Sequence, residues 1–345
     1  MVTMQQVADR AKVSISTVSF VVNDTKPVTP ETRERVLEAI DALGYRRNTM
    51  ARALASRRSH VLALIYPLLE QRNHHAFVSA AATAAREHGY SLVLWPLHSD
   101  EVSTEITALI QAGSADGVLL MEVQLEDERV TRLREAEAPF VLIGRTRELG
   151  GIDYVDIDFE RTTELAIDEL ARLGHRDFSL VIEDLSETPL AGYAPPLRTE
   201  EKFRAVIAER GFTGAVFRVP HRAREVSELT DTLLREAPAT TAIIAMHDEA
   251  SLALVSTLPH RGLEIPRDMS IVALATSTSI TDLMDPALAN YEAPGWELGR
   301  AAAEALIARL EGRDGPSVQT LIPCSRREGQ TVGPAPARHV QSRSA

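Results

Sequence analysis

The chain has 345 residues, of which 44% are hydrophobic and 25% are charged, and its formal net charge is −12. The length indicates two or three domains, and the composition is typical of a globular protein in water. The lone cysteine, Cys324, excludes a disulfide framework within the chain and a multi-cysteine metal site. The sequence has neither a basic-then-apolar leader nor an apolar run of about 18 residues, so we expect a cytoplasmic protein.

Basic residues are concentrated at the start of the chain. Residues 1–60 contain ten Lys and Arg against six Asp and Glu, a net charge of +4. Because the whole chain carries −12, the other 285 residues carry −16. A basic segment on an acidic chain is typical of a nucleic-acid-binding domain, although an ordinary solvated helix can have the same charge.

The first predicted helix begins near the N-terminus. Thr3 and Gln6 have the spacing of a capping box, in which the two side chains satisfy backbone N–H groups of the first turn. Val7, Ala8 and Ala11 recur at helical spacing and form the apolar face of this helix.

A turn and a second helix follow directly. Residues 12–13 turn the chain, and Ser14 is a good N-cap. The residues of the second helix that can face the first are Val18, Val21 and Val22. This short connection between two apolar-faced helices predicts that they pack against each other.

A third helix is predicted after Thr29, which caps it, with Pro30 at the first helical position, where a missing N–H costs nothing. Gly44 ends it. Its apolar positions are Val36, Leu37, Ile40 and Leu43. Three capped helices, two of them joined by a tight turn, predict a helix-turn-helix headpiece over residues 1–47, a unit that places a helix in the DNA major groove.

Residues 48–58 form a predicted hinge helix and linker. Asn48 can cap a helix that runs through Leu54. Eight residues cannot hold a helix alone in water, so a partner must stabilise this one.

Residues 59–333 are predicted to form a two-lobed core. Short apolar runs alternate with amphipathic stretches near 76–88, 101–112 and 126–136, and a second alternating series follows. The predicted strands are 61–66, 91–94, 117–121 and 140–143, then 178–182, 216–219, 242–245 and 269–274. This α/β pattern predicts two doubly wound parallel-sheet lobes with a ligand cleft at their junction. Residues 334–345 show no periodicity, and we expect a disordered tail.

The headpiece resembles that of the LacI/GalR family of bacterial transcriptional regulators. The matching residues are 7–14, 17–19, 22–23, Thr32, Arg33, Val36 and 43–45, and residues 48–55 are similar to the family's hinge helix. Weaker matches continue through the core at 61–66, 87–90, 116–118, 173–176 and 298–299. The resemblance implies a homodimer on double-stranded operator DNA, with a periplasmic-binding-protein-like core that binds a small-molecule effector.

The resemblance also implies which residues contact DNA. Hydroxyl groups, amides and helix-start backbone N–H groups suit phosphate oxygens. The predicted headpiece contacts are Thr3, Ser14, Ile15, Ser16, Thr17, Ser19, Phe20, Asn23 and Thr32, and the predicted hinge contacts are Asn48, Ala51, Leu54 and Ala55. Leu54 would be the apolar wedge that kinks the duplex from the minor groove, or simply the buried face of a linker turn.

Base recognition departs from the best-known member of the family, which has Tyr, Gln and Arg where this chain has Ile15, Ser16 and Phe20. Arginine would grip guanine in bidentate fashion, whereas phenylalanine can only pack on a thymine methyl or on nearby backbone. The alternative is that Phe20 turns inward and packs the headpiece. The operator sequence therefore cannot be carried over.

The predicted effector residues also depart from the family. Asn73 and Phe77 lie in the first strand-to-helix region of the core, and Arg198, His247 and Asp248 lie on the other side of the expected cleft. Where relatives usually carry arginine this chain has Thr199, with Arg198 one position earlier, and Ala275 replaces an aspartate suited to sugar hydroxyls. We expect simple monosaccharides to be poor effectors, and Arg198 suggests an anionic or carbonyl-bearing ligand.

Enzyme motifs are missing: the sequence has no Gly-x-Ser-x-Gly, Walker loop, His-Glu-x-x-His or Gly-x-Gly-x-x-Gly. We expect no catalytic residues, no metal and no cofactor. The sequence predicts a cytoplasmic, homodimeric repressor controlled by a small molecule, without excluding a tetramer. A receptor module, an activator or an effector-independent regulator are the alternatives.

Overall fold

A computed structural model describes most of the chain. The described residues are 2–23, 26–45, 58–67, 75–97, 106, 108–109, 111–188, 190–220, 223–246, 248–276, 281, 284–313 and 315–337. The chain divides into two compact units, Met1–Ser59 and His60–Ala345, which are considered separately below. We call the first unit's helical part the headpiece and the second unit the core.

The headpiece consists of α1 (Met4–Ala11), α2 (Ile15–Asn23) and α3 (Pro30–Leu43). Their apolar faces meet in one cluster made by Val7, Ala8, Ala11, Val18, Val21, Val22, Val36 and Ala39. These positions are spaced by three or four residues within each helix, so each helix turns one stripe inward. The predicted inward faces of the first two helices are confirmed.

The predicted caps are also confirmed. The Thr3 side chain accepts from the Gln6 backbone N–H, and the Thr3 backbone N–H donates to Gln6 Oε1 at 2.8 Å, which completes the capping box. Thr29 caps α3, and Gly44 ends it in the left-handed region at φ 61°. One prediction is wrong: Leu37 is 52% exposed, because Val36 and Ala39 occupy the inward stripe of α3.

The first lobe of the core has a six-stranded sheet, counted over the described residues, in the order β11-β5-β4-β3-β1-β2. Its strands are β1 (Val61–Pro67), β2 (Ser91–Leu97), β3 (Gly117–Leu120), β4 (Phe140–Ile143), β5 (Tyr154–Ile157) and β11 (Gln319–Ile322). All pairings in this sheet are parallel. Alternate residues of each strand enter separate clusters on the two faces, as in β1, where Leu62 and Leu64 lie in one and Ala63 and Ile65 in the other.

The second lobe repeats this order with β12-β10-β9-β8-β6-β7. Its strands are β6 (Asp177–Asp184), β7 (Thr213–Pro220), β8 (Ala242–Met246), β9 (Ser270–Thr276), β10 (Asn290–Glu292) and β12 (Ser325–Arg327). The pairing of β12 with β10 is antiparallel, and the other pairings are parallel. The two doubly wound, parallel-dominated lobes expected from the sequence are thus confirmed.

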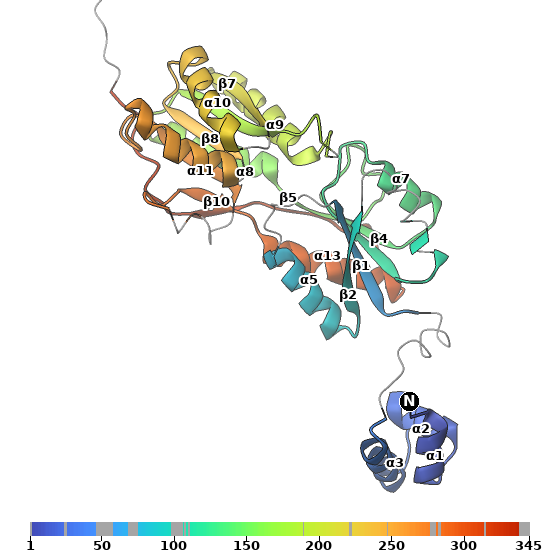
Figure 1. Ribbon diagram of the computed structural model, residues 1–345. Coiled ribbons are helices and arrows are strands. Elements are labelled where there is room, and N and C mark those ends of the chain that lie inside the picture. Colours follow the sequence, from blue (N-terminus) through green and yellow to red (C-terminus); the bar gives the residue numbers. More distant parts are fainter. Residues whose placement is uncertain are drawn as a thin grey trace, which may run out of the picture. The chain divides into compact units, whose positions relative to one another are not determined.

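Helices cover the sheets. The first lobe has α5 (His75–Glu87), α7 (Glu128–Glu135) and α13 (Gly295–Leu310), and the second has α8 (Phe159–Arg172), α9 (Ala194–Arg210), α10 (Ala223–Glu236), α11 (Asp248–Thr257) and the short η1 (Pro259–Arg261). Figure 1 shows α5 and α13 side by side, and both contribute to one cluster of the first lobe. The predicted helix near 101–112 lies largely outside the described residues.

The chain crosses between the lobes at three places, which the sequence did not predict. It leaves the first lobe after β5, returns between β10 and α13, and leaves again between β11 and β12 (Figure 1). Four short strands, β5, β10, β11 and β12, were also not predicted, because each contains polar residues and lacks the continuous apolar run that marks the equally short β4. Ile157 packs against the cores of both lobes and marks the first crossing.

The tail prediction fails for residues 334–337, which belong to the described structure. The Ala335 N–H donates to Leu173 O at 2.9 Å, and Gly333 O lies 3.0 Å from Nε2 of the fully buried His175. These bonds hold the segment against the second lobe. Residues 338–345 lie outside the described residues.

Candidate DNA-binding and regulatory sites

The first turn of α2 faces away from the headpiece core. Ser14, Ile15 and Ser16 are exposed, with Ile15 at 44%, whereas Val18 on the next turn is fully buried. Ser14 caps the helix, since its Oγ accepts from the Thr17 N–H at 3.1 Å. The helix start therefore presents two free side chains and the unpaired N–H groups of a first helical turn, which suit a phosphate backbone or a base edge.

Phe20 lies outside the set of residues that pack into the headpiece core. Its ring is half-buried, and Lys26 Nζ lies 5.0 Å from the ring centroid, within cation–π range. This position favours a surface role for Phe20 over the packing alternative, and it places a positive charge beside the aromatic ring.

Several predicted contact residues also serve as caps. Thr3 caps α1, and Thr32 Oγ1 accepts from Thr29 Oγ1 at 2.9 Å at the start of α3. Ser14 Oγ and Thr17 Oγ1 lie 2.8 Å apart. Ser19 is half-buried in α2, and of Asn23 only the backbone is described, as the last residue of that helix. A capping hydroxyl still has a free lone pair, so capping does not exclude a phosphate contact.

The predicted hinge residues Asn48, Ala51, Leu54 and Ala55 lie outside the described residues, as do the predicted effector residues Asn73 and His247. Asp248 is the first residue of α11. Phe77 is 4% exposed and belongs to the core cluster of the first lobe, so the structure gives it a packing role in α5.

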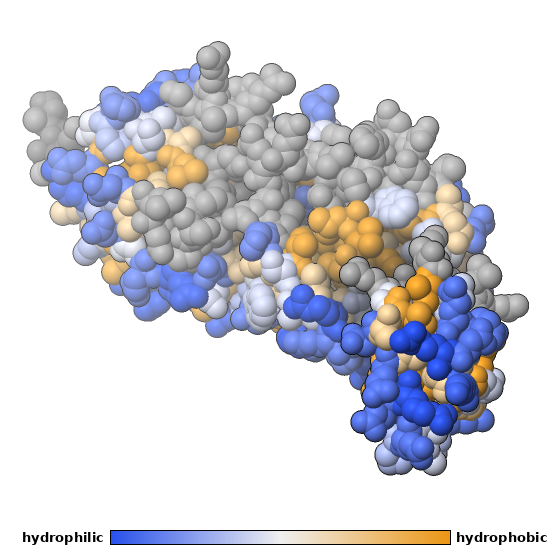
Figure 2. Space-filling view, turned by 60° about the horizontal axis from the view of Figure 1, so that its bottom comes forward, coloured by the Kyte–Doolittle hydropathy of each residue, from blue (hydrophilic) through white to orange (hydrophobic). Residues whose placement is uncertain are grey.

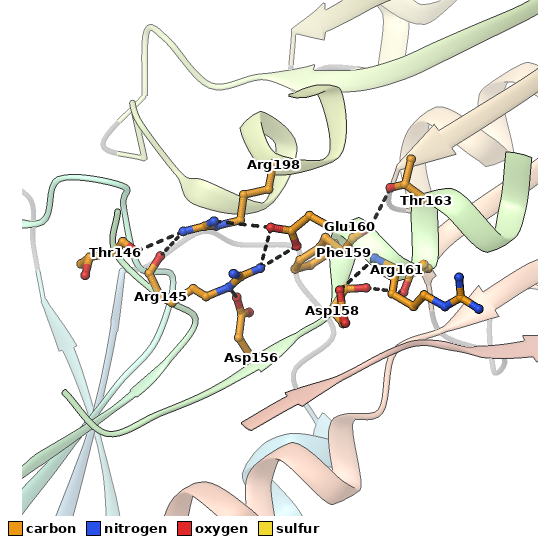
Figure 3. Close-up of polar contacts among 10 residues, drawn as sticks. Arg145, Thr146, Asp156, Asp158, Phe159, Glu160, Arg161, Thr163 and Arg198 are labelled. Atoms are coloured by element: carbon orange, nitrogen blue, oxygen red, sulfur yellow. Dashed lines mark hydrogen bonds and ion pairs between the residues drawn. The ribbon is translucent and has the colours of Figure 1, made fainter. Parts of the chain in front are cut away.

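Arg198 lies at the contact between the two lobes (Figure 3). It belongs to α9 of the second lobe, and its Nη2 donates to Thr146 O at 3.0 Å and to Arg145 O at 3.4 Å, just beyond β4 of the first lobe. Its Nη1 lies 3.5 Å from Glu160 Oε1, in the first turn of α8. Its two terminal nitrogens therefore have partners within the protein, whereas its buried Nε has no hydrogen-bond partner.

Arg145 completes this cluster from the first lobe. Its Nε donates to Asp156 Oδ2 at 3.0 Å, within the same lobe, and its Nη2 donates to Glu160 Oε1 at 2.7 Å, across the joint. We call Arg145, Asp156, Glu160 and Arg198 the interlobe cluster. Figure 3 shows the two guanidinium groups converging on the Glu160 carboxylate.

The charges of the interlobe cluster balance, with two arginines against two carboxylates. Burial raises the pKa of Asp156 to about 6, although the Arg145 guanidinium beside it opposes this shift. Burial also lowers the pKa of Arg198, and the like charge of Arg145 adds to that effect. Arg198 has carboxylate and carbonyl partners within the protein, and the anionic or carbonyl-bearing ligand suggested by the sequence stays a prediction.

Backbone contacts join the lobes near this cluster. Leu125 N–H donates to Gly192 O at 2.9 Å, and Ala194 N–H donates to Val123 O at 3.2 Å, which forms an isolated antiparallel bridge. The Arg147 N–H donates to Leu125 O at 2.8 Å, so the loop beyond β4 is tied to the same segment. The N-terminus of α9 is therefore held to the first lobe by backbone and side-chain contacts together.

The sequence did not identify Arg145, Asp156 or Glu160. Asp156 and Glu160 flank a strand-to-helix junction at residues 157–159, which is a weak signal, because carboxylates are common at helix starts. Arg198 is 38 residues from Glu160 along the chain, and no spacing rule connects them. Within the described part of the chain, no cluster of three or more His, Cys, Asp or Glu side chains could hold a metal ion, and no helix is long and apolar enough to cross a membrane.

Comparison with known proteins agrees with both units. Residues 3–48 match the family described as "Bacterial regulatory proteins, lacI family", and residues 167–332 match the "Periplasmic binding protein-like domain". Catabolite control protein A from Priestia megaterium is 28% identical over 314 residues, which cover 88% of this chain and 91% of that protein.

Solved structures share the fold. The transcriptional regulator CelR–cellobiose complex is 25% identical, with a TM-score of 0.70 over 96% of this chain and 100% of that one. The lac repressor dimer bound to operator and the anti-inducer ONPF is 22% identical, with a TM-score of 0.83 over 96% of this chain and 99% of that one. At this identity the second likeness concerns the fold alone.

Proposed function

The chain belongs to the LacI family of bacterial regulatory proteins and is a ligand-controlled, DNA-binding transcription regulator, and on that premise we propose a more specific function. It represses transcription by binding a palindromic operator as a homodimer, and a small molecule between the lobes of the core controls this binding. We propose further that it works in the cytoplasm and catalyses no reaction.

The exposed first turn of α2 is the observation that carries this proposal. Ile15 and Ser16 are exposed at the start of α2, whereas Val18 on the next turn of the helix is buried in the headpiece core. A rigid helix with a free N-terminal turn fits the recognition helix of a helix-turn-helix unit. Ser14, Thr17, Ser19 and Thr32 supply hydroxyl groups for phosphate oxygens nearby.

A dimer is supported by the edge of the first lobe's sheet. Strand β2 is one of the two edge strands of this sheet, and its Val93 and Leu94 are 40% and 44% exposed. Apolar side chains gather on one face of the first lobe in Figure 2. An apolar edge strand is a liability unless another surface covers it, and a second copy of the chain can do so symmetrically.

The test of DNA binding uses the full chain and a random pool of duplex DNA. We expect the selected sites to be inverted repeats that bind two chains each, because one headpiece buries too little surface for tight specific binding. Affinity should fall steeply with salt, since phosphate neutralisation releases counterions. Selection of single half-sites by a monomer, with little salt dependence, would contradict the proposal.

Two variants test the assigned contacts. Phe20→Ala should change the base preference within the half-site while the headpiece stays folded, and Leu54→Ala should reduce DNA bending together with specific affinity. Glu38→Gln, an exposed residue of α3, is the control and should change neither. Unfolding of the headpiece by Phe20→Ala would restore the packing interpretation, and unchanged bending by Leu54→Ala would remove the minor-groove role.

The controlling ligand is proposed to bind in the cleft between the lobes. CelR is known from its complex with cellobiose, which makes an oligosaccharide a first candidate to test here. Ala275 lacks the carboxylate that suits sugar hydroxyls, so we expect plain monosaccharides to bind poorly. A thermal-shift screen that finds tight monosaccharide binding would refute this expectation.

A further inference from the structure

The interlobe cluster contains four charged side chains that converge from both lobes. Arg145 lies just beyond β4 and Asp156 lies in β5 of the first lobe, whereas Glu160 and Arg198 come from α8 and α9 in the second. The side chains of Arg145, Asp156 and Arg198 are 11%, 7% and 15% exposed, so water screens them little.

The contacts are of two kinds. The Arg198 guanidinium donates to the main-chain oxygens of residues 145 and 146, and the positions of these oxygens are set by the backbone of the loop. The guanidinium also approaches the side chain of Glu160. Arg145 reaches across in the opposite direction to Glu160. A movement that separates the lobes at this point lengthens both sets of contacts together and leaves the Arg198 guanidinium without its partners in the first lobe, whereas Arg145 keeps Asp156.

The loop that receives Arg198 is tied to residues 122–129 through the Arg147 N–H, which donates to Leu125 O at 2.8 Å, and those residues are held by their own hydrogen bonds. Asp127 Oδ2 accepts from the Gln124 N–H at 3.1 Å, and Arg129 Nη2 donates to Glu122 O at 2.8 Å. The same segment forms the backbone bridge to residues 192 and 194 at the start of α9. Arg198 therefore connects a fixed loop of one lobe to a helix of the other, rather than two mobile surfaces.

We propose that the interlobe cluster is a clasp that holds the two lobes at one angle. An effector then acts by displacing Arg198 or Glu160 from their partners across the joint. The second statement rests on the proposed function, because it assumes that the lobe angle controls DNA binding. A ligand can shift that equilibrium only by its different affinities for the clasped and released arrangements.

The clasp can be tested without DNA, by energy transfer between dyes on the two lobes. Arg132→Cys on α7 and Arg235→Cys on α10 provide labelling sites, since their side chains are 42% and 65% exposed. The native Cys324 is 5% exposed, and burial raises the pKa of its thiol to about 12, so it stays protonated and reacts slowly.

In this labelled protein, Arg198→Gln should broaden the transfer distribution and lower its mean, because the lobes then sample wider angles. Glu160→Gln should act in the same direction, and it serves if Arg198→Gln fails to fold. The matched control is Arg204→Gln on the same helix α9, whose Nε pairs at 2.9 Å with Glu200 inside the second lobe. Transfer in both cluster variants indistinguishable from that of Arg204→Gln would overturn the clasp.

The link to regulation is tested by operator affinity in the same variants. We expect Arg198→Gln and Glu160→Gln to change affinity about tenfold, a typical size for coupling between sites, with Arg204→Gln unchanged. If energy transfer shows wider lobe angles in these variants but operator affinity is unchanged, the proposed link to regulation is wrong and the clasp itself stands. A parent protein that binds no operator would refute the proposed function, while the energy-transfer result would still decide whether the clasp exists.

Discussion

The two lobes of the core share one strand order but differ at their edges. Strand β2 ends the first sheet and exposes Val93 and Leu94, whereas β7 ends the second sheet with Arg218 exposed and ion-paired to Glu200. Charged side chains on an edge strand discourage pairing with other chains. The same topology therefore leaves exposed apolar side chains on this edge of one lobe and a charged pair on the corresponding edge of the other.

The lobes also differ in how their helices pack. In the first lobe, Gly299 of α13 lies so close to α5 that an added Cβ would meet Phe77 O at 2.2 Å. The helices of the second lobe, α8 to α11, contain no glycine. The close approach of α13 to α5 therefore depends on a glycine, whereas the described helices of the second lobe pack without one.

The largest effect is expected at the β2 edge. Leu94→Glu should separate the proposed dimer and weaken operator binding about a thousandfold, because a symmetric contact places the new charges near one another and a single headpiece binds poorly. Sedimentation and DNA titration measure the two consequences. The matched control is Leu197→Glu on α9 of the second lobe, which is 38% exposed and should leave both unchanged. A Leu94→Glu variant that remains dimeric would place the interface elsewhere.

Gly299→Ala should lower the free energy of unfolding by about 3 kcal/mol, because α5 and α13 must move apart to admit the methyl group. Chemical denaturation followed by circular dichroism measures this loss. Gly315→Ala, beyond the end of α13, has no atom within 4 Å of an added Cβ and is the control. Equal stability of the two variants would show that the helices yield easily.

His175→Ala should cost the second lobe about 2 kcal/mol, since it leaves buried polar groups without partners. The imidazole is fully buried, with Nε2 3.0 Å from Gly333 O and Nδ1 2.9 Å from Thr241 Oγ1. A carbonyl oxygen only accepts, so Nε2 donates and Nδ1 accepts from the hydroxyl. The exposed His88 of the first lobe provides the control, and His88→Ala should leave stability unchanged.

The smallest effect is the pH dependence of stability, which should have opposite signs at two sites. Burial raises the pKa of Asp156 from 3.8 to about 6. Its contribution to the free energy of unfolding is therefore present in acid and is lost as pH rises through about 6. Burial lowers the pKa of His175 from its ordinary 6.5. The contribution of His175 to the free energy of unfolding is therefore present above pH 6.5 and is lost as pH falls below that value.

Chemical denaturation of variants at several pH values between 4 and 7 separates the contributions of Asp156 and His175 to the free energy of unfolding. As pH rises from about 4 to 6, Asp156→Asn should gain stability relative to the parent, because the variant has no carboxylate to ionise. His175→Ala should lose stability relative to the parent as pH rises toward 6.5. The same slope in both variants would contradict the opposite assignments.

The headpiece and the strand-helix alternation could be predicted from the sequence because their signals are local. The Thr3–Gln6 capping box, Pro30 at a helix start and Gly44 at a helix end each act within a few residues. The apolar runs of β1 and β4 were predicted for a similar reason, since continuous burial leaves a continuous pattern. The sequence did not predict the exposure of Leu37, because Val36 and Leu37 are both apolar and only one of two adjacent helical residues can lie at the centre of the buried face.

The sequence by itself determined the helix ends, the buried strands and the presence of a DNA-binding headpiece. Only the tertiary structure decided the three crossings between the lobes, the return of α13 to the first lobe and the joining of Arg198 to Arg145 and Glu160. Local propensity and periodicity extend over a turn or a strand, whereas these contacts join residues tens of positions apart. Their formation depends on the free energy of packing two whole lobes, which no short segment of sequence encodes.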